Sequence, residues 1–273
     1  MIVVTGGTGN VGRALVAELA GEGEAVTAVA RHITPADVPP GVRAVAADLG
    51  RPTGLAPALE GAAALFLLVA GDDPEGILKQ AAAAGVTKVV LLSSQGVGTR
   101  PHGYAHAARF EAALTGSGPA FTVLRSGGMA SNALAWAEPV RQHRVAAAPF
   151  ADVALPFVDP DDVAAVAAAV LCQDGHDGIT YTLTGPEATT PRQRAAAIAH
   201  ALAEPVTFLE QSREEARAQM ARFMPTAVVE ATLAILGEPT AEEQAVTEDV
   251  RRVLGRPATP FAVWAKRNAP AFR

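Results

Sequence analysis

The stretch that decides the fold is Val4-Thr5-Gly6-Gly7-Thr8-Gly9-Asn10-Val11-Gly12, near the start of the 273-residue chain. It lies between an apolar run and an amphipathic run, so its glycines join an expected strand to an expected helix. Glycine permits a tight turn and a close approach of the backbone to a pyrophosphate, and a helix N-terminus presents free N–H groups to that anion. The G-x-x-G-x-x-G spacing in this context predicts a dinucleotide-binding unit. We expect cofactor contacts from Gly6, Thr8, Gly9, Asn10, Val11 and Gly12.

Outward from this loop, short apolar runs alternate with longer amphipathic runs. The expected strands are residues 2–5, 25–30, 42–46, 64–69, 88–93 and 121–124. The expected helices are residues 10–21, 54–60, 74–84 and 105–115. Because the strands read as continuous apolar runs, helices should cover both faces of the sheet. The pattern predicts an α/β fold with a Rossmann-type, doubly wound parallel sheet.

The character of the sequence changes after Leu124. The segment 126–132 reads as a loop, and an Ala-rich helix is expected near 162–172, followed by a strand near 179–183. Helix-start signals at Thr190, Ser212 and Thr259 predict further helices. We therefore expect a dinucleotide-binding core over residues 1–132. Residues 133–273 should form a small, mainly helical substrate lobe on the carboxyl edge of the sheet, within one structural unit.

Composition excludes several classes of protein. With 22 Lys and Arg against 28 Asp and Glu, the formal net charge is −6, which argues against nucleic-acid binding and against a basic membrane-surface protein. The lone Cys172 has apolar neighbours and reads as a core residue, and no Cys cluster is available for a metal site. No basic leader precedes the first strand, so we expect a cytoplasmic protein. The sequence leaves a monomer and a homodimer equally open.

The end of the second expected strand bears on the choice of cofactor. An NAD site usually has Asp or Glu here to bind the ribose hydroxyl, but this chain has Arg31-His32. A guanidinium binds the 2′-phosphate of NADP bidentately. NADPH is therefore predicted in preference to NADH, the alternative being that Arg31 is a solvated surface charge.

Other cofactor contacts are expected at the ends of later strands. Asp48-Leu49 suits a loop beside the adenine, although Asp48 can instead cap a turn. The Leu68-Val69-Ala70 backbone should border the nicotinamide ribose. Ser93 or Ser94, at the end of the fifth expected strand, can face the nicotinamide or the substrate.

Several of these segments together resemble one known family. They are Thr5–Gly12, Ala30-Arg31, Ser93–Val97, Glu111, Ser117-Gly118, Thr122–Arg125 and Asn132, with a weaker match at Val158–Ala164. Their order and spacing are similar to those of the NmrA-like atypical short-chain dehydrogenases/reductases. That group includes NADPH:quinone oxidoreductases, phenylpropanoid and isoflavone-type reductases, and NADP-binding redox-sensing regulators. The resemblance implies the fold and the cofactor, but it leaves the reaction open.

The usual catalytic pair of the wider superfamily is absent. Ordinary members use Tyr-x-x-x-Lys, whereas Tyr104 is followed by Ala108 at the lysine position. The remaining candidates for proton donation or substrate contact are His106, Tyr104, Ser94 and Asn132. Each has an alternative role in the fold, His106 as a helix-surface residue and Tyr104 as a packing residue. Arg109 and Glu111 read as a solvated charge cluster.

A site without the Tyr-x-x-x-Lys pair suits a conjugated hydride acceptor. A quinone delocalises the charge that it receives, so a cofactor, an apolar pocket and a few donors suffice. Met129, Trp136, Phe150 and Phe157 are candidates to line that pocket, or else belong to the core. We predict an NADPH-dependent oxidoreductase that transfers hydride to an apolar quinone or conjugated carbonyl substrate. The alternatives are a non-catalytic NADP(H) sensor with a protein partner, and a tailoring enzyme for isomerisation, cyclisation or dehydration.

Overall fold

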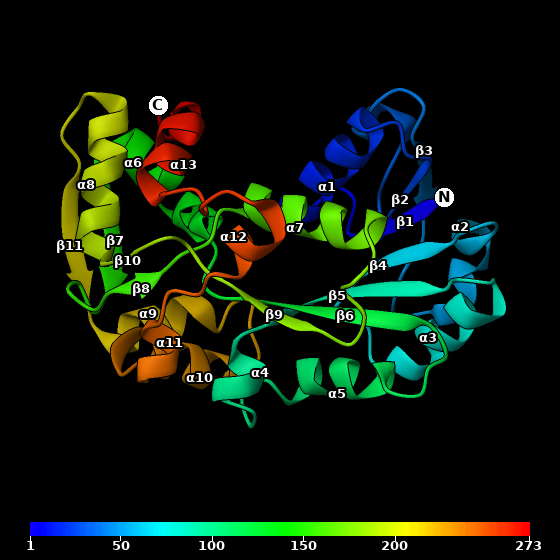
Figure 1. Ribbon diagram of the computed structural model, residues 1–273. Helices are drawn as coiled ribbons and strands as arrows, with labels where there is room; N and C mark the ends of the chain where they lie inside the picture. The colour runs from blue at the N-terminus through cyan, green and yellow to red at the C-terminus, as the bar shows by residue number, and fades with distance from the viewer.

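A parallel sheet of seven strands forms the centre of the computed structural model, which describes residues 1–273. The strand order is β3-β2-β1-β4-β5-β6-β9 (Figure 1). The strands are β1 (Ile2–Thr5), β2 (Val26–Ala30), β3 (Arg43–Ala46), β4 (Ala64–Leu68), β5 (Lys88–Ser94), β6 (Ala120–Ser126) and β9 (Thr180–Leu183). The chain order reverses between β1 and β4, and doubly wound sheets bind ligands at that point.

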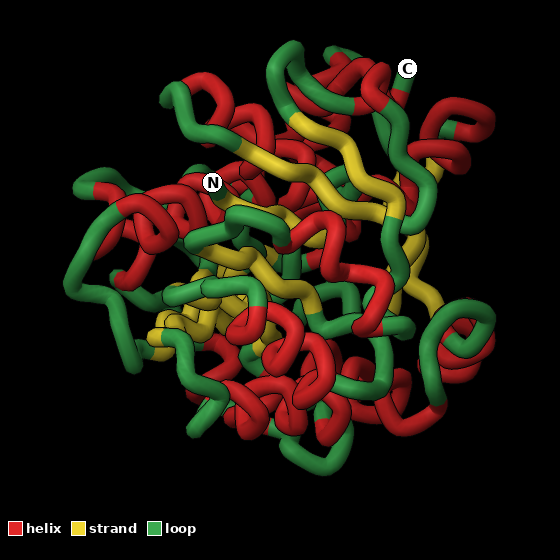
Figure 2. The backbone as a smooth tube through the Cα atoms, turned by 90° about the vertical axis from the view of Figure 1, so that its right-hand side faces the viewer, coloured by secondary structure: helices red, strands yellow, loops and turns green.

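Helices cover both faces of this sheet, because its inner strands are apolar on both sides. One face is covered by α1 (Asn10–Gly21), α7 (Pro160–Cys172) and α12 (Asp249–Leu254). The other is covered by α2 (Ala56–Leu59), α3 (Pro74–Ala83) and α5 (Ala105–Leu114). In the turned view of Figure 2, yellow strands lie between red helices at the top and bottom of the molecule. The predicted α/β, Rossmann-type fold is confirmed.

Part of the segment expected to form the lobe, residues 133–273, packs with the main sheet. The strand expected near 179–183 is present, but β9 pairs in parallel with β6 and so extends the main sheet. The Ala-rich α7 packs beside α1, and its Val163, Ala164 and Ala167 are completely buried. Residues 160–183 therefore belong with the core and not with the lobe. Cys172, expected in the core, is exposed because it ends α7.

The lobe has its own apolar core and its own short strands. β7 (Val145–Pro149) pairs in parallel with β11 (Thr207–Gln211), and β8 (Leu155–Pro156) pairs antiparallel with β10 (Ala188–Thr189). These strands were not expected. Around β7 pack η3 (Ala130–Trp136), α6 (Ala137–His143), α8 (Pro191–Leu202), α13 (Phe261–Asn268) and η4 (Ala269–Phe272). The remaining α-helices of the chain are α4 (Gly96–Thr99), α9 (Arg213–Met220), α10 (Thr226–Gly237) and α11 (Ala241–Gln244). Two short 3-10 helices, η1 (Pro35–Asp37) and η2 (Pro52–Leu55), complete the secondary structure.

The helix-start signals in this region act as predicted. Thr190 and Gln193 form a capping box at α8, and Ser212 and Glu215 form one at α9. The Thr259-Pro260 pair directly precedes α13. None of the helices combines the length and the apolar character needed to cross a bilayer.

Candidate active site

The glycine-rich loop runs from the end of β1 into α1. At two of its positions, backbone conformation or close packing leaves room only for glycine. Gly6 has a φ of +67°, and a Cβ there would lie 2.1 Å from Leu68 Cδ1. A Cβ on Gly12 would lie 2.1 Å from the Gly6 carbonyl oxygen. The turn and the close approach of the helix to the loop therefore require glycine at both positions.

Gly9 is less crowded than Gly6 and Gly12. A Cβ there would meet one neighbour, the Gly6 carbonyl oxygen at 3.2 Å. Gly9 is also the N-cap of α1, and no side chain caps this helix. The first-turn N–H groups are thus left for an external acceptor, and the empty space beside Gly9 fits a pyrophosphate.

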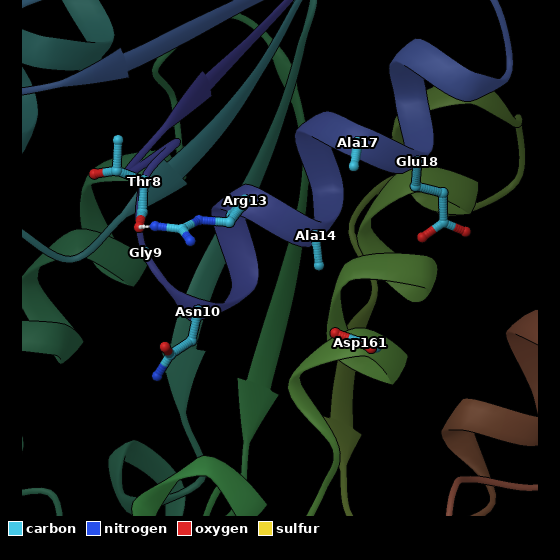
Figure 3. Close-up of a pocket in the computed structure, with 8 residues that line it drawn as sticks. All are labelled: Thr8, Gly9, Asn10, Arg13, Ala14, Ala17, Glu18 and Asp161. Atoms are coloured by element: carbon cyan, nitrogen blue, oxygen red, sulfur yellow. Dashed lines mark hydrogen bonds between the residues drawn. The ribbon is translucent and has the colours of Figure 1, made fainter. Parts of the chain in front are cut away.

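A groove of about 610 Å³ begins at this loop and follows α1 (Figure 3). Arg13 adds positive charge at the loop end, where its Nη2 donates to the Thr8 carbonyl oxygen at 3.1 Å. The far end is acidic, with Glu18 and Asp161. Burial raises the pKa of Glu18, and the nearby Glu22 raises it further. Only the loop end of the groove therefore suits an anion.

β1 and β4 are tied together where the nicotinamide half of a dinucleotide is expected. Thr5 Oγ1 donates to the Phe66 carbonyl oxygen and accepts from the Leu68 N–H, both at 2.9 Å. Leu68, Val69 and Ala70 are half-buried at this edge of the sheet. Their placement fits the contact predicted for them.

At the adenosine end, Arg31 follows the last residue of β2 and is exposed. Asp48 is exposed too, and its Oδ1 accepts from the Gly50 N–H at 3.0 Å. This bond is the turn cap that was the alternative for Asp48. Leu49, the next residue, is buried in the apolar core.

A second cavity, of about 690 Å³, opens beyond β5 and β6 and reaches under the lobe. Its wall is mostly apolar and includes Met129, Trp136 and Phe157, while Phe150 is not part of it. Three of the four predicted catalytic residues line it, namely Ser94, Tyr104 and Asn132. Arg194 and Glu243 are the charged residues of this wall, and no sequence pattern pointed to either of them.

The fourth candidate, His106, does not line the cavity. It is exposed on α5, with its Nδ1 4.0 Å from Asp72 Oδ1 and its ring edge-to-face with Phe110. The alternative, a helix-surface histidine, is what the structure shows. Tyr104 instead packs its ring against Gly96, where an added Cβ would lie 2.3 Å from the ring.

Ser93 and Glu111 also differ from expectation. Ser93 is buried, and its hydroxyl donates to Glu111 Oε1 at 2.5 Å. Glu111 in turn pairs with Arg125, at 2.6 Å from Nη2 to Oε2, so it is not a solvated charge. The hydrogen bond with Glu111 raises the pKa of Arg125 although burial opposes this. Ser93 thus serves the fold in place of the expected cofactor contact, whereas Ser94 remains at the cavity.

Comparisons with known proteins agree with this geometry. A family model described as NAD(P)H-binding matches residues 6–174. The chain belongs to this NAD(P)H-binding family. It is 37% identical to a (4-alkanoyl-5-oxo-2,5-dihydrofuran-3-yl)methyl phosphate reductase of Streptomyces griseus, over 100% of this chain and 99% of that one. It is 30% identical to an NAD(P)H azoreductase of Xenophilus azovorans, with the same coverage.

A solved structure is similar over the whole chain. The NADPH-dependent quinone oxidoreductase of Escherichia coli, complexed with NADPH, aligns with a TM-score of 0.80 at 26% identity. The alignment covers 98% of this chain and 99% of that one. The resemblance to NmrA-like atypical short-chain dehydrogenases/reductases is confirmed. The reductase relatives identify this family member as an NAD(P)H-dependent oxidoreductase and favour that role over a sensor or a tailoring enzyme.

Proposed function

We propose that this protein uses NADPH to reduce a quinone or another conjugated carbonyl compound in the cavity beyond β5 and β6. The observation that carries the proposal is the direct link between the two parts of the site. Asn10, in the glycine-rich loop, donates from Nδ2 to Ser131 Oγ at 3.2 Å, and Ser131 lines the cavity. A dinucleotide on the loop and a substrate in the cavity would therefore be neighbours.

The wall of the cavity suits a hydride acceptor that needs little acid catalysis. When bound, NADPH supplies a hydride, which carries two electrons to the acceptor, and leaves as NADP⁺. Apolar residues such as Met129 and Trp136 would exclude water from a flat conjugated substrate. The hydroxyls of Tyr104 and Ser94 and the amide of Asn132 can orient the carbonyl oxygen, and Tyr104 or water would supply its proton.

The wall also explains why an isolated ketone is a poor candidate. No lysine stands beside Tyr104 to activate it, because the position four residues later is Ala108. An isolated ketone concentrates negative charge on one oxygen, and a strong acid is then needed. A quinone or enone spreads that charge over its conjugated atoms, so positioning and desolvation carry more of the reaction.

Arg31 supports the preference for NADPH. Its exposed guanidinium follows β2, where a ribose phosphate would lie, and no carboxylate is paired with it. A carboxylate at this place would bind the free ribose hydroxyl of NADH instead. The complex of the similar quinone oxidoreductase with NADPH supports the same choice.

The relatives' names describe electron-poor, conjugated substrates as well. They name a butenolide phosphate with an alkanoyl group, an azo compound and a quinone. The test is steady-state oxidation of NADPH with benzoquinone, an alkanoyl butenolide and, as the matched control, cyclohexanone. We expect turnover with the first two and none with the isolated ketone. Equal turnover of cyclohexanone would contradict the proposal, as would no turnover of any acceptor.

A further inference from the structure

One buried cation in the cavity wall has no role in the proposed reaction. Arg194 lies in α8, is 6% exposed, and lines the cavity. The other charged residue of the wall, Glu243, is already neutralised by Arg100, whose Nε and Nη2 donate to its two oxygens at 2.8 and 3.0 Å. Arg194 is therefore the uncompensated charge of this cavity.

The chain gives Arg194 very few partners. No carboxylate pairs with it, and its one hydrogen bond runs from Nη1 to the Thr189 carbonyl oxygen at 3.2 Å. A guanidinium has five N–H donors, so most of them have no acceptor within the protein. Beside it, the hydroxyl of Thr189 is buried without any partner.

One aromatic contact holds the guanidinium in place. Its carbon atom lies 3.7 Å from the centre of the Phe157 ring. That ring also packs against the loop before η3, because a Cβ on Gly128 would lie 2.8 Å from Phe157 Cε1. Phe157 thus covers one face of the guanidinium and fixes it next to the loop that ends at Met129, just before Ser131 in η3. The N–H groups at its edge are left to the cavity.

Burying an unpaired guanidinium lowers the stability of the folded protein. Burial lowers the pKa of Arg194 to about 9, and no acidic residue offsets the effect. An aromatic face recovers part of the lost hydration, but a buried charge is usually paired. A residue kept only for packing would not need the charge, since an apolar side chain of the same length fills such space at lower cost.

We propose that Arg194 is an anion-binding subsite and that the natural acceptor carries a phosphate or carboxylate group. This rests on the proposed function, because it concerns the substrate of the same cavity. The anionic group would take up the free N–H donors of Arg194, and the conjugated part would extend along the apolar wall towards Tyr104. Arg194 then selects the substrate and orients it, without taking part in hydride transfer.

Binding measurements test the subsite without requiring turnover. Protein saturated with NADP⁺, so that the glycine-rich loop is occupied, is titrated by calorimetry with phenyl phosphate, benzoate and the neutral benzyl alcohol. We expect at least one of the anions to bind more tightly than the alcohol. Arg194→Met should lower the affinity for that anion by roughly 10–150-fold, the effect of losing a charge-assisted bidentate contact. The tighter of phenyl phosphate and benzoate identifies the anionic group.

A matched control separates this effect from general electrostatics. Arg192→Met removes a cation two residues away on α8 that is exposed and paired with Asp152. It should leave the anion affinity unchanged, and Arg194→Lys should retain part of it. Melting curves identify any variant that fails to fold. Equal anion affinity in Arg194→Met and wild type would overturn the proposal. A wild type that binds benzyl alcohol as tightly as the tighter of the two anions would overturn it too.

Kinetics then connect the subsite to catalysis. With NADPH, naphthoquinone sulfonate and the parent naphthoquinone form a matched pair of acceptors. We expect the ratio of their kcat/KM values to fall at least about tenfold in Arg194→Met, mainly through KM of the sulfonate. An unchanged ratio would contradict the proposal. If neither quinone is reduced, the proposed function fails, while the calorimetric result still decides whether Arg194 binds anions.

Discussion

Asn10 donates a hydrogen bond to Ser131 across the boundary between the glycine-rich loop and the substrate cavity, with 3.2 Å between Nδ2 and Oγ. The two residues are 121 positions apart in the sequence. Asn10 begins α1, and Ser131 lies in η3, the first element beyond the loop that follows β6. The bond fixes the relative position of two parts of the site that the reaction needs side by side.

Gly9→Val tests the assignment of the glycine-rich loop. Its backbone is extended, with a φ of −81°, and an added Cβ would have one contact within 4 Å, the Gly6 carbonyl oxygen at 3.2 Å, so a small shift of the loop should accommodate valine. The branched side chain would fill the space assigned to the pyrophosphate. We expect calorimetry to show no NADPH binding and the stability to change by about 1 kcal/mol or less. Gly21→Ala, at the other end of α1 with nothing within 4 Å, is the control. Retained NADPH affinity in Gly9→Val would show that the dinucleotide binds elsewhere.

Arg31→Ala tests the choice of cofactor. Wild type should bind NADPH more tightly than NADH, and the variant should lose roughly 10–150-fold in NADPH affinity while NADH affinity stays the same. Arg43→Ala is the control, because Arg43 is also exposed but begins the neighbouring strand β3, at the amino end of the parallel strands, whereas Arg31 follows β2 at their carboxyl end. Equal affinities of wild type for the two cofactors would refute the role of Arg31.

Tyr104→Phe and His106→Ala test which side chain assists the acceptor. Tyr104 lines the cavity and His106 does not, so the tyrosine variant should lose more activity. Without an activating lysine, that loss should stay below about 100-fold, the lower end of acid–base contributions. The rates are measured with NADPH and benzoquinone over a range of pH. A larger loss in His106→Ala would mean that the imidazole reaches the substrate by a movement that this structure does not show.

Glu111→Gln tests the half-buried ion pair of Glu111 with Arg125 behind the site. Its side chain is 13% exposed and accepts from both Ser93 and Arg125. Removing the charge leaves Arg125 unpaired, and for a pair that is partly exposed we expect a loss of about 2 kcal/mol in the free energy of unfolding. Chemical denaturation measures this loss. Arg109→Ala, whose exposed side chain donates only to the Asp72 carbonyl oxygen, should change stability far less. Similar losses of stability in the two variants would argue against a stabilising role of the Glu111–Arg125 pair.

The Arg100–Glu243 pair, which ties α11 to the segment after β5, predicts a dependence on pH. Burial alone would raise the pKa of Glu243, but hydrogen bonds from Arg100 and the Thr240 N–H hold it below its ordinary value of 4.5. A carboxyl group with a lowered folded pKa stabilises the fold above its unfolded pKa and loses that contribution as the pH falls through the folded pKa. Wild type should therefore exceed Glu243→Gln in stability above about pH 4.5, and the difference should shrink in more acidic solution. A difference that is constant with pH would contradict this.

Local patterns were enough to predict the core, because its signals lie within single elements. The glycine spacing fixes the turn after β1, and apolar runs mark the buried strands. β7 was missed since Val145-Ala-Ala-Ala-Pro149 has no strand character of its own. It pairs with β11, which lies about sixty residues later in the chain, and such pairing overrides intrinsic propensity.

The site was predicted less completely, for a related reason. The sequence places Ser93 and Glu111 in separate elements, and only the packing of α5 on β5 brings them together. Arg194 carries no sequence signal, because burial without an acidic partner depends on the whole lobe. Tyr104 directly precedes α5 and His106 lies in its first turn, and only the fold determines which of them lines the cavity.

Transfer of deuterium from the cofactor to the acceptor shows whether this protein catalyses hydride transfer to a conjugated carbonyl. The protein is incubated without oxygen with NADPH deuterated at C4 and an alkanoyl butenolide, and the reduced product is analysed by mass spectrometry and NMR. A hydride added to the conjugated carbon does not exchange with water, so we expect one carbon-bound deuterium in each product molecule when the transferred face is labelled. An NADPH complex that forms but reduces neither the butenolide nor benzoquinone, or a reduced butenolide without deuterium whichever face is labelled, would contradict the proposed function.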